Sequence, residues 1–138
     1  MIYSAAGSHE AVLCMGSNCG ESHAAFRNAL EAISGIAQVM SRSEAYLTPA
    51  ISDSLEHTPA LRPYLNMVLT IETSLCREEL EKHLKQMEIN AGRDADCRRR
   101  GDVPLDIDIV VIDGRVIRPR DFNSGFFRKG FYSLTPCG

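Results

Sequence analysis

The sequence lacks a long hydrophobic run, a strong charge of either sign and the marks of a secretory leader. Its apolar runs, such as Ile109 to Ile112, are far shorter than the roughly 20 residues that cross a bilayer. The net charge of −3 gives no general attraction to nucleic acids or membrane surfaces. Residues Met1 to Ser4 have neither the basic flank nor the apolar core of a signal peptide. We therefore expect a cytoplasmic protein that binds neither nucleic acid nor membrane.

The cysteines and histidines also lack the spacing of a disulfide framework or a zinc site. There are five cysteines, an odd number, and no Cys-x-x-Cys occurs. The four histidines show no metal-binding spacing with the cysteines or with each other. Reduced thiols in a reducing compartment are the natural interpretation.

A chain of 138 residues is expected to form one domain, residues 1–138, with residues 1–9 as a loose lead-in. Apolar periodicity and turn residues predict strands at 11–15, 39–47, 65–72 and 103–112, and helices at 22–35 and 76–92. Asp113-Gly114 predicts a hairpin turn back through residues 115–117. The order βαββαβ is that of an α+β, ferredoxin-like sandwich, an antiparallel sheet with both helices on one face, plus a short C-terminal hairpin. The polar segments 50–63 and 93–102 are expected to be mobile lids.

Asp106-Ile107-Asp108 is the pattern with the most chemical content. It interrupts a stretch, Val103 to Ile112, that otherwise has the composition of a buried strand. Side chains alternate along a strand, so both carboxylates share one face. Neighbouring carboxylates repel, more so when buried, and a hard divalent cation such as Mg²⁺ with phosphate relieves that repulsion. The alternative is a half-exposed strand whose polar face happens to carry two Asp.

Three further groups could bind an anion or a polar ring. Glycines in Gly16 to Gly20, between a strand and a helix, let backbone approach a ligand, although an ordinary turn explains them as well. Arg93 and the run Arg98 to Arg100 suit phosphate oxygens, although a solvated charged loop is the commoner explanation. Asn66 places an amide in an apolar strand, where it can pair with the edge of a heterocycle or be satisfied within the sheet. Glu88 by itself would be interpreted as a surface residue.

Nucleotidyltransferases of the polymerase-beta type also combine a Gly-Ser turn with Asp-x-Asp. In that family the two lie close together in one local unit. Here Gly16 and Asp106 are separated by both expected helices. We therefore reject this interpretation.

In order and spacing these residues resemble the 6-hydroxymethyl-7,8-dihydropterin pyrophosphokinases (HPPK) of folate biosynthesis. The resemblance runs from about Val12 to Leu134 and is carried by Gly16-Ser17-Asn18, Gly20, Thr48-Pro49, Tyr64-Leu65-Asn66, Glu72 to Leu75, Glu88, Gly92-Arg93 and Leu105 to Ile109. It implies a ferredoxin-like fold, ATP as co-substrate, two Mg²⁺ ions, and transfer of pyrophosphate to the hydroxymethyl group of the pterin with release of AMP. We expect a monomer whose partners are two small molecules, ATP and the dihydropterin.

The resemblance also implies roles for individual residues. Asp106 and Asp108 would hold both metal ions and, with Arg93, act in catalysis. The ATP and phosphate contacts would come from Glu88, Arg93, Arg99, Arg100 and Lys129. The pterin would contact Thr48, Pro49, Tyr64, Asn66 and Phe131, with Asn66 pairing with the ring edge and Phe131 stacking on the ring.

Two of the chain's departures from the family bear on catalysis. The family's Trp-Gly-Pro-Arg-Thr is here Arg100 to Pro104, so Val103 stands at the position of a catalytic arginine. No histidine corresponds to the family's later Pro-His pair. Arg98, Arg99 or Arg100 could replace the lost charge. Two alternatives remain: a diverged paralogue that binds nucleotide or pterin without efficient transfer, and a ferredoxin-like interaction module in which the Asp pair has no role.

Overall fold

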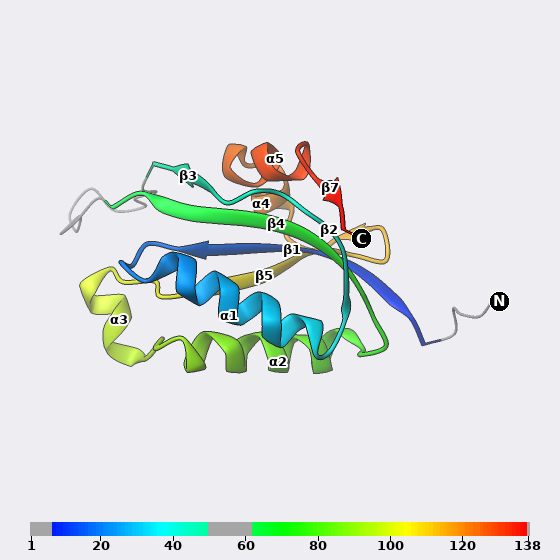
Figure 1. The fold of residues 1–138 in the computed structure, drawn as a ribbon, viewed down its shortest axis with the longest axis horizontal. Coiled ribbons are helices and arrows are strands. Elements are labelled where there is room, and N and C mark those ends of the chain that lie inside the picture. The colour runs from blue at the N-terminus through cyan, green and yellow to red at the C-terminus, as the bar shows by residue number, and fades with distance from the viewer. Residues whose placement is uncertain (1–6, 50–61, 138) are drawn as a thin grey trace.

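The computed structural model describes residues 7–49 and 62–137 (Figure 1). Residues 1–6, 50–61 and 138 are outside the described residues. Most of the lead-in expected at 1–9, and most of the lid expected at 50–63, therefore lies outside the described residues.

An antiparallel sheet lies at the centre of the molecule. Within the described residues its strands are β1 (His9–Ser17), β2 (Gln38–Arg42), β3 (Tyr46–Thr48), β4 (Tyr64–Thr73), β5 (Asp106–Ile112), β6 (Arg115–Val116) and β7 (Thr135–Pro136). Their order across the sheet is β6-β5-β1-β4-β2-β7, with β3 also paired to β4. The four main strands follow the order β5-β1-β4-β2, which confirms the predicted ferredoxin-like fold.

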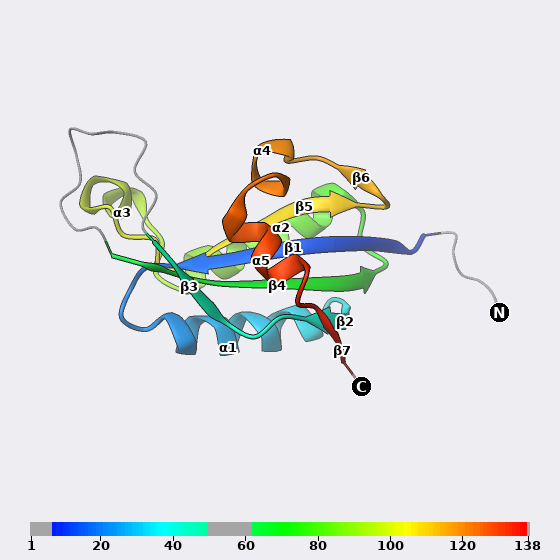
Figure 2. The same ribbon diagram turned by 90° about the horizontal axis from the view of Figure 1, so that it is seen from above.

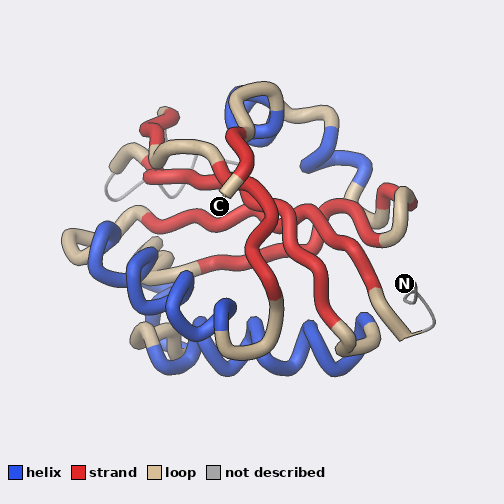
Figure 3. Tube along the Cα trace, turned by 45° about the vertical axis from the view of Figure 1, so that its right-hand side comes forward, coloured by secondary structure: helices blue, strands red, loops and turns tan. Residues whose placement is uncertain are grey.

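Two long helices, α1 (Ser22–Ser34) and α2 (Arg77–Asn90), cover one face of this sheet (Figures 1 and 3). Phe26 and Ile33 of α1 and Leu80 and Leu84 of α2 are buried against alternate strand residues such as Leu13. Burial of each such side chain contributes about 1.5–3 kcal/mol. The helix periodicity seen in the sequence therefore marks the main core correctly.

The opposite face carries a second layer that the sequence analysis did not include. After the predicted Asp113-Gly114 turn and β6, the chain forms α4 (Pro119–Phe122) and α5 (Gly125–Phe131), on the other side of the sheet from α1 and α2 (Figures 2 and 3). Phe127 is fully buried there against Cys14, Val68 and Val110. This layer covers part of a face that would otherwise be exposed.

Two segments differ from the sequence prediction. The expected strand 39–47 is broken between β2 and β3, because buried Ser43 donates its N–H to Val68 O and accepts the Val68 N–H with its side-chain Oγ. A side chain thus replaces a main-chain partner and the ladder is interrupted. The expected loop 93–102 contains a short helix, α3 (Ala95–Arg100), because Asp94 caps its start and Gly101, at φ 73°, ends it.

The seating of α5 on the sheet depends on Gly130. A Cβ there would lie 2.5 Å from Tyr46 Oη and 2.6 Å from Val68 Cγ2. We expect Gly130→Ala to lower the free energy of unfolding by about 1–3 kcal/mol through overpacking, as measured by urea denaturation. Gly125→Ala in the same helix is the control, because no atom lies within 4 Å of its Cβ position. Equal losses in the two variants would contradict this packing.

Candidate active site

The sheet register brings Asn66, Gly16 and Asp106 into one row across β4, β1 and β5. Residues paired across strands share a face, and strands are spaced about 4.8 Å apart, so Asn66 and Asp106 are separated by about 10 Å. Asp108, opposite Cys14, lies in the next row of the same face. Gly16 carries no side chain, and a Cβ there would lie 3.8 Å from both Asn66 Oδ1 and the Tyr64 ring. The space between the amide and the carboxylates is therefore open.

Arg93 and Glu88 are held beside this row by α2 and the start of β5. Arg93 Nη1 donates to Asp106 Oδ1 at 2.9 Å and pairs with Glu88 Oε1 at 3.2 Å. The other Glu88 oxygen accepts the Ile107 N–H at 2.9 Å, and the Glu88 side chain is only 14% exposed. Glu88 is therefore no ordinary surface residue, since it joins α2 to β5 and orients the guanidinium of Arg93.

The pKa values of the two carboxylates shift in opposite directions. Burial raises the pKa of Asp108 to about 8, and the neighbouring Asp106 carboxylate adds to the rise. Burial alone would raise the pKa of Asp106 as well. Hydrogen bonds that the Asp106 carboxylate accepts from Asp108 and Arg93 together have the larger effect and hold its pKa below the usual value. Ionisation of both carboxylates together is therefore unfavourable, and a bound cation would favour it. Arg118, 3.9 Å from Asp108, supplies only part of that effect.

The residues present fit Mg²⁺ bound together with phosphate. The Asp106 and Asp108 side chains are 37% and 26% exposed, so their oxygens are accessible. Over residues 7–49 and 62–137, no three His, Cys, Asp or Glu side chains cluster as a metal site. Mg²⁺ is commonly held by one or two carboxylates, with phosphate and water completing its coordination. The Asp pair therefore suits a metal that arrives with a nucleotide.

Two grooves meet at this site. The first, which we call the β5 groove, has a volume of about 830 Å³ and runs between α2 and the edge of β5, past Glu88, Asp106 and Asp108. The second, the Tyr64 groove, has a volume of about 480 Å³ and lies between Tyr64 and the α3 segment. The residues that line both grooves are Arg93, Asp94 and Arg98. A ligand spanning the two grooves would pass these side chains.

Most of the expected pterin-binding residues gather where β3 meets β4. Asn66 is buried and its Nδ2 donates to Thr48 Oγ1 at 2.7 Å and to the Tyr64 carbonyl at 3.2 Å. Pro49, directly after β3, is exposed. Phe131 comes from α5, where its ring stacks on Phe127 at 5.2 Å between centroids, and it lines neither groove.

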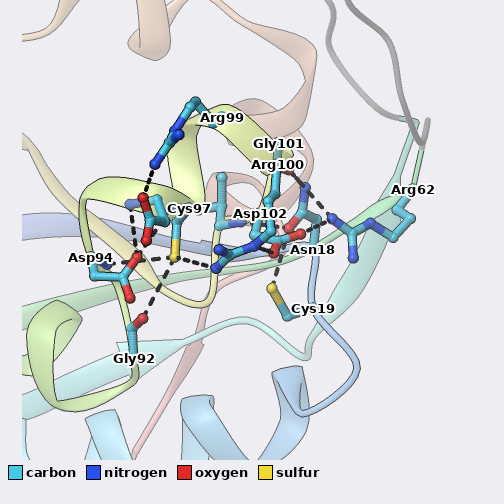
Figure 4. Close-up of polar contacts among 12 residues, drawn as sticks. Asn18, Cys19, Arg62, Gly92, Asp94, Cys97, Arg99, Arg100, Gly101 and Asp102 are labelled. Atoms are coloured by element: carbon cyan, nitrogen blue, oxygen red, sulfur yellow. Dashed lines mark hydrogen bonds and ion pairs between the residues drawn. The ribbon is translucent and has the colours of Figure 1, made fainter.

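Three of the expected phosphate-binding residues lie outside both grooves. Arg99 is 80% exposed and pairs with Asp96 on the outer side of α3 (Figure 4). Arg100 donates to Asp102 at 2.8 Å. Lys129 lies 5.5 Å above the ring of Tyr46. The structure thus brings Arg93, Glu88 and the Asp pair together but places these three elsewhere.

The residues that hold the α3 segment in place were not predicted from the sequence. Arg62 forms an ion pair with Asp102, which also binds Arg100 (Figure 4). Asn18 Oδ1 accepts the Val103 N–H at 2.7 Å, and its Nδ2 donates to Gly101 O at 2.9 Å. Asn18, in the Gly16 to Gly20 turn, therefore acts as a clamp that holds this turn to the end of α3. The sequence did contain one indication of these contacts. Asp102 stands where the family has proline, and a carboxylate there can pair with a nearby arginine.

Asn18→Ala should loosen the end of α3. The variant leaves the Val103 N–H without its side-chain acceptor, so we expect faster hydrogen exchange at that amide. The Ile107 amide, held by Glu88, should keep its protection and serves as the internal control. Unchanged exchange at Val103 would show that the clamp does not restrain this segment.

Comparison with known protein families supports the resemblance. Residues 12–136 match the family described as 7,8-dihydro-6-hydroxymethylpterin-pyrophosphokinase, and the match spans most of the chain. Members of this family are diphosphokinases of folate biosynthesis that use ATP and Mg²⁺. No helix within the described ranges combines the length and apolar character needed to cross a membrane. The chain therefore belongs to the 7,8-dihydro-6-hydroxymethylpterin-pyrophosphokinase family.

Proposed function

We propose that this protein transfers pyrophosphate from MgATP to 6-hydroxymethyl-7,8-dihydropterin. The observation that carries the proposal is the row formed by Asn66, Gly16 and Asp106 on one face of the sheet. The reaction needs a ring-binding amide and a phosphate-binding metal site that face a common space, and Asn66 and Asp106 would supply the amide and one metal-binding carboxylate. Of this row Asp106 lines the β5 groove, and Tyr64, two residues before Asn66, lines the second groove.

The transfer consists of one displacement at the β-phosphorus. The hydroxymethyl oxygen forms a bond to this phosphorus, and the bond from it to the oxygen bridging the α-phosphate breaks. AMP leaves with that oxygen, and the hydroxyl proton passes to water. Such a reaction depends on positioning and charge neutralisation rather than on a covalent protein nucleophile.

On the phosphate side, Asp106 and Asp108 would hold two Mg²⁺ ions. When bound, these ions would neutralise phosphate charge during the transfer. Arg93 already lies against Asp106 and is oriented by Glu88, so it can contact a phosphate oxygen without rearrangement of its anchor. ATP contacts from Arg100 or Lys129 would require these side chains to leave Asp102 and Tyr46.

On the pterin side, the Asn66 amide is already oriented. Its Nδ2 is held by Thr48 and the Tyr64 carbonyl, and no donor from the described residues contacts its Oδ1. That oxygen can accept from an N–H on the pterin edge. Tyr64 and Pro49 would shape the pocket around it. Stacking by Phe131 would require its ring to leave Phe127.

The alternative is a paralogue that binds the same ligands without efficient transfer. It is favoured by Val103, which puts an apolar side chain in the Tyr64 groove where the family has a catalytic arginine. It shares the Asp pair and Asn66 with the enzyme, so ligand binding alone does not separate the two functions.

Steady-state AMP release distinguishes the enzyme from the paralogue that lacks efficient transfer. With ATP, Mg²⁺ and 6-hydroxymethyl-7,8-dihydropterin, we expect AMP to form in step with the pterin diphosphate. With 6-methyl-7,8-dihydropterin, which lacks the attacking hydroxyl, we expect none. If both pterins bind and neither supports AMP release, the paralogue replaces the enzyme.

A further inference from the structure

The chain lacks the family's loop arginine beside the point where its two grooves meet. Val103 lines the Tyr64 groove at the position of the family's loop arginine. Arg93, which lines both grooves, is already paired with Glu88 and Asp106. A transferring pyrophosphate carries several negative charges, and a second cation aimed at it would lower the barrier.

Three consecutive arginines on α3 could supply that cation, and their positions differ. Consecutive residues of a helix project about 100° apart, so the three side chains point in different directions. Arg99 is turned outward toward Asp96, and Arg100 is turned toward Cys97 and Asp102 (Figure 4). Arg98 lines both the β5 groove and the Tyr64 groove.

The fold fixes this orientation of α3. Asp94 caps the start of the helix and also lines both grooves, four residues and about one turn before Arg98. Cys97 is buried on the inner side, with its Sγ 3.6 Å from Gly92 O. The clamp from Asn18 to Val103 restrains the far end. Because both ends of α3 are held, the helix cannot rotate freely, and Arg98 stays on the side that faces the grooves.

We propose that Arg98 is the second phosphate-contacting arginine of this protein, in place of the arginine missing at position 103. The inference rests on the proposed function. Arg98 would act on the displacement already described, in which the hydroxymethyl oxygen bonds to the β-phosphorus as the bond to AMP breaks. Arg98 would transfer no proton. Its guanidinium would neutralise negative charge on the pyrophosphate as this group passes between the grooves.

Single-turnover AMP release from the full chain tests this catalytic role. Arg98→Ala should slow the step by about 100-fold or more, as loss of one preorganised donor does, and Arg98→Lys should restore part of the rate. Arg99→Ala should lose much less. Arg27→Ala, on the exposed side of α1, removes the same charge and should leave the rate unchanged. A rate for Arg98→Ala within about threefold of the parent, or an equal loss in Arg99→Ala, overturns the proposal.

A binding measurement keeps the inference separate from the proposed function. Calorimetry with inorganic pyrophosphate and Mg²⁺ should show affinity for Arg98→Ala weakened about 10-fold or more, since a charge-assisted hydrogen bond is lost, with Arg27→Ala unchanged. If the parent releases no AMP, the proposed function fails while this measurement still decides whether Arg98 contacts a polyphosphate. Equal affinity in parent and Arg98→Ala overturns the inference in either case.

Discussion

Asp106→Ala is expected to slow AMP release by about 10³-fold or more and to weaken MgATP binding, while the protein stays folded. The substitution removes one of the two carboxylates proposed to hold Mg²⁺, and metal ions supply several kcal/mol of charge stabilisation in such transfers. The fold is spared because the Asp106 side chain is 37% exposed, and Arg93 keeps its pairing with Glu88. Asp108→Ala should behave in the same way.

The measurement combines single-turnover kinetics with calorimetry of ATP binding in the presence of Mg²⁺. Glu31→Ala, an exposed carboxylate on α1, removes the same charge far from the Asp pair and should match the parent. Thermal unfolding of each variant checks that the fold is retained. Unchanged MgATP affinity in Asp106→Ala would show that the metal is held elsewhere.

Asn66→Ala is expected to weaken pterin binding by about 10- to 100-fold without changing the affinity for MgATP. An unpaired polar group in a closed pocket costs about 1–3 kcal/mol, and every 1.4 kcal/mol is a factor of ten. Asn66 is buried and its amide is oriented by Thr48 and Tyr64, so its loss removes a preformed contact. Calorimetry with the dihydropterin and a non-hydrolysable ATP analogue measures both affinities.

Thr70→Val is the matched control on the same strand and face. Thr70 bonds to Ser41 at 2.5 Å between their hydroxyls, and it pairs with Val12 rather than with Gly16 of the Asn66 row. Its loss should leave both affinities unchanged. If Asn66→Ala binds the pterin as the parent does, the pocket lies in another part of the protein.

The main fold and the face of the Asp pair could be predicted from the sequence because both depend on local periodicity. Alternation placed Asp106 and Asp108 together, and the spacing of residues such as Phe26 and Leu80 marked the helix faces. The break at Ser43 could not be predicted, because it arises when a serine hydroxyl takes the place of a main-chain partner on a neighbouring strand. The α4–α5 layer was missed because its helices are too short to show a periodic pattern.

The candidate site was predictable in its parts but not in its contacts. The sequence indicated Arg93, Glu88 and Asn66, and the structure shows that Glu88 anchors Arg93 rather than standing free on the surface. The sequence could not distinguish Arg98 from Arg99, since the choice depends on α3, a six-residue helix in a segment expected to be a loop. Only the register across three strands shows that Asn66 and Asp106 face one space.

Phosphorus NMR of a single reaction mixture shows directly whether pyrophosphate moves from ATP to the pterin. With protein, ATP, Mg²⁺ and 6-hydroxymethyl-7,8-dihydropterin, we expect the ATP signals to decrease while AMP and a diphosphate ester of the pterin appear in equal amounts. This outcome requires that the β- and γ-phosphates move together. Formation of ADP with a pterin monophosphate, or no change in the ATP signals while both substrates bind, would contradict it.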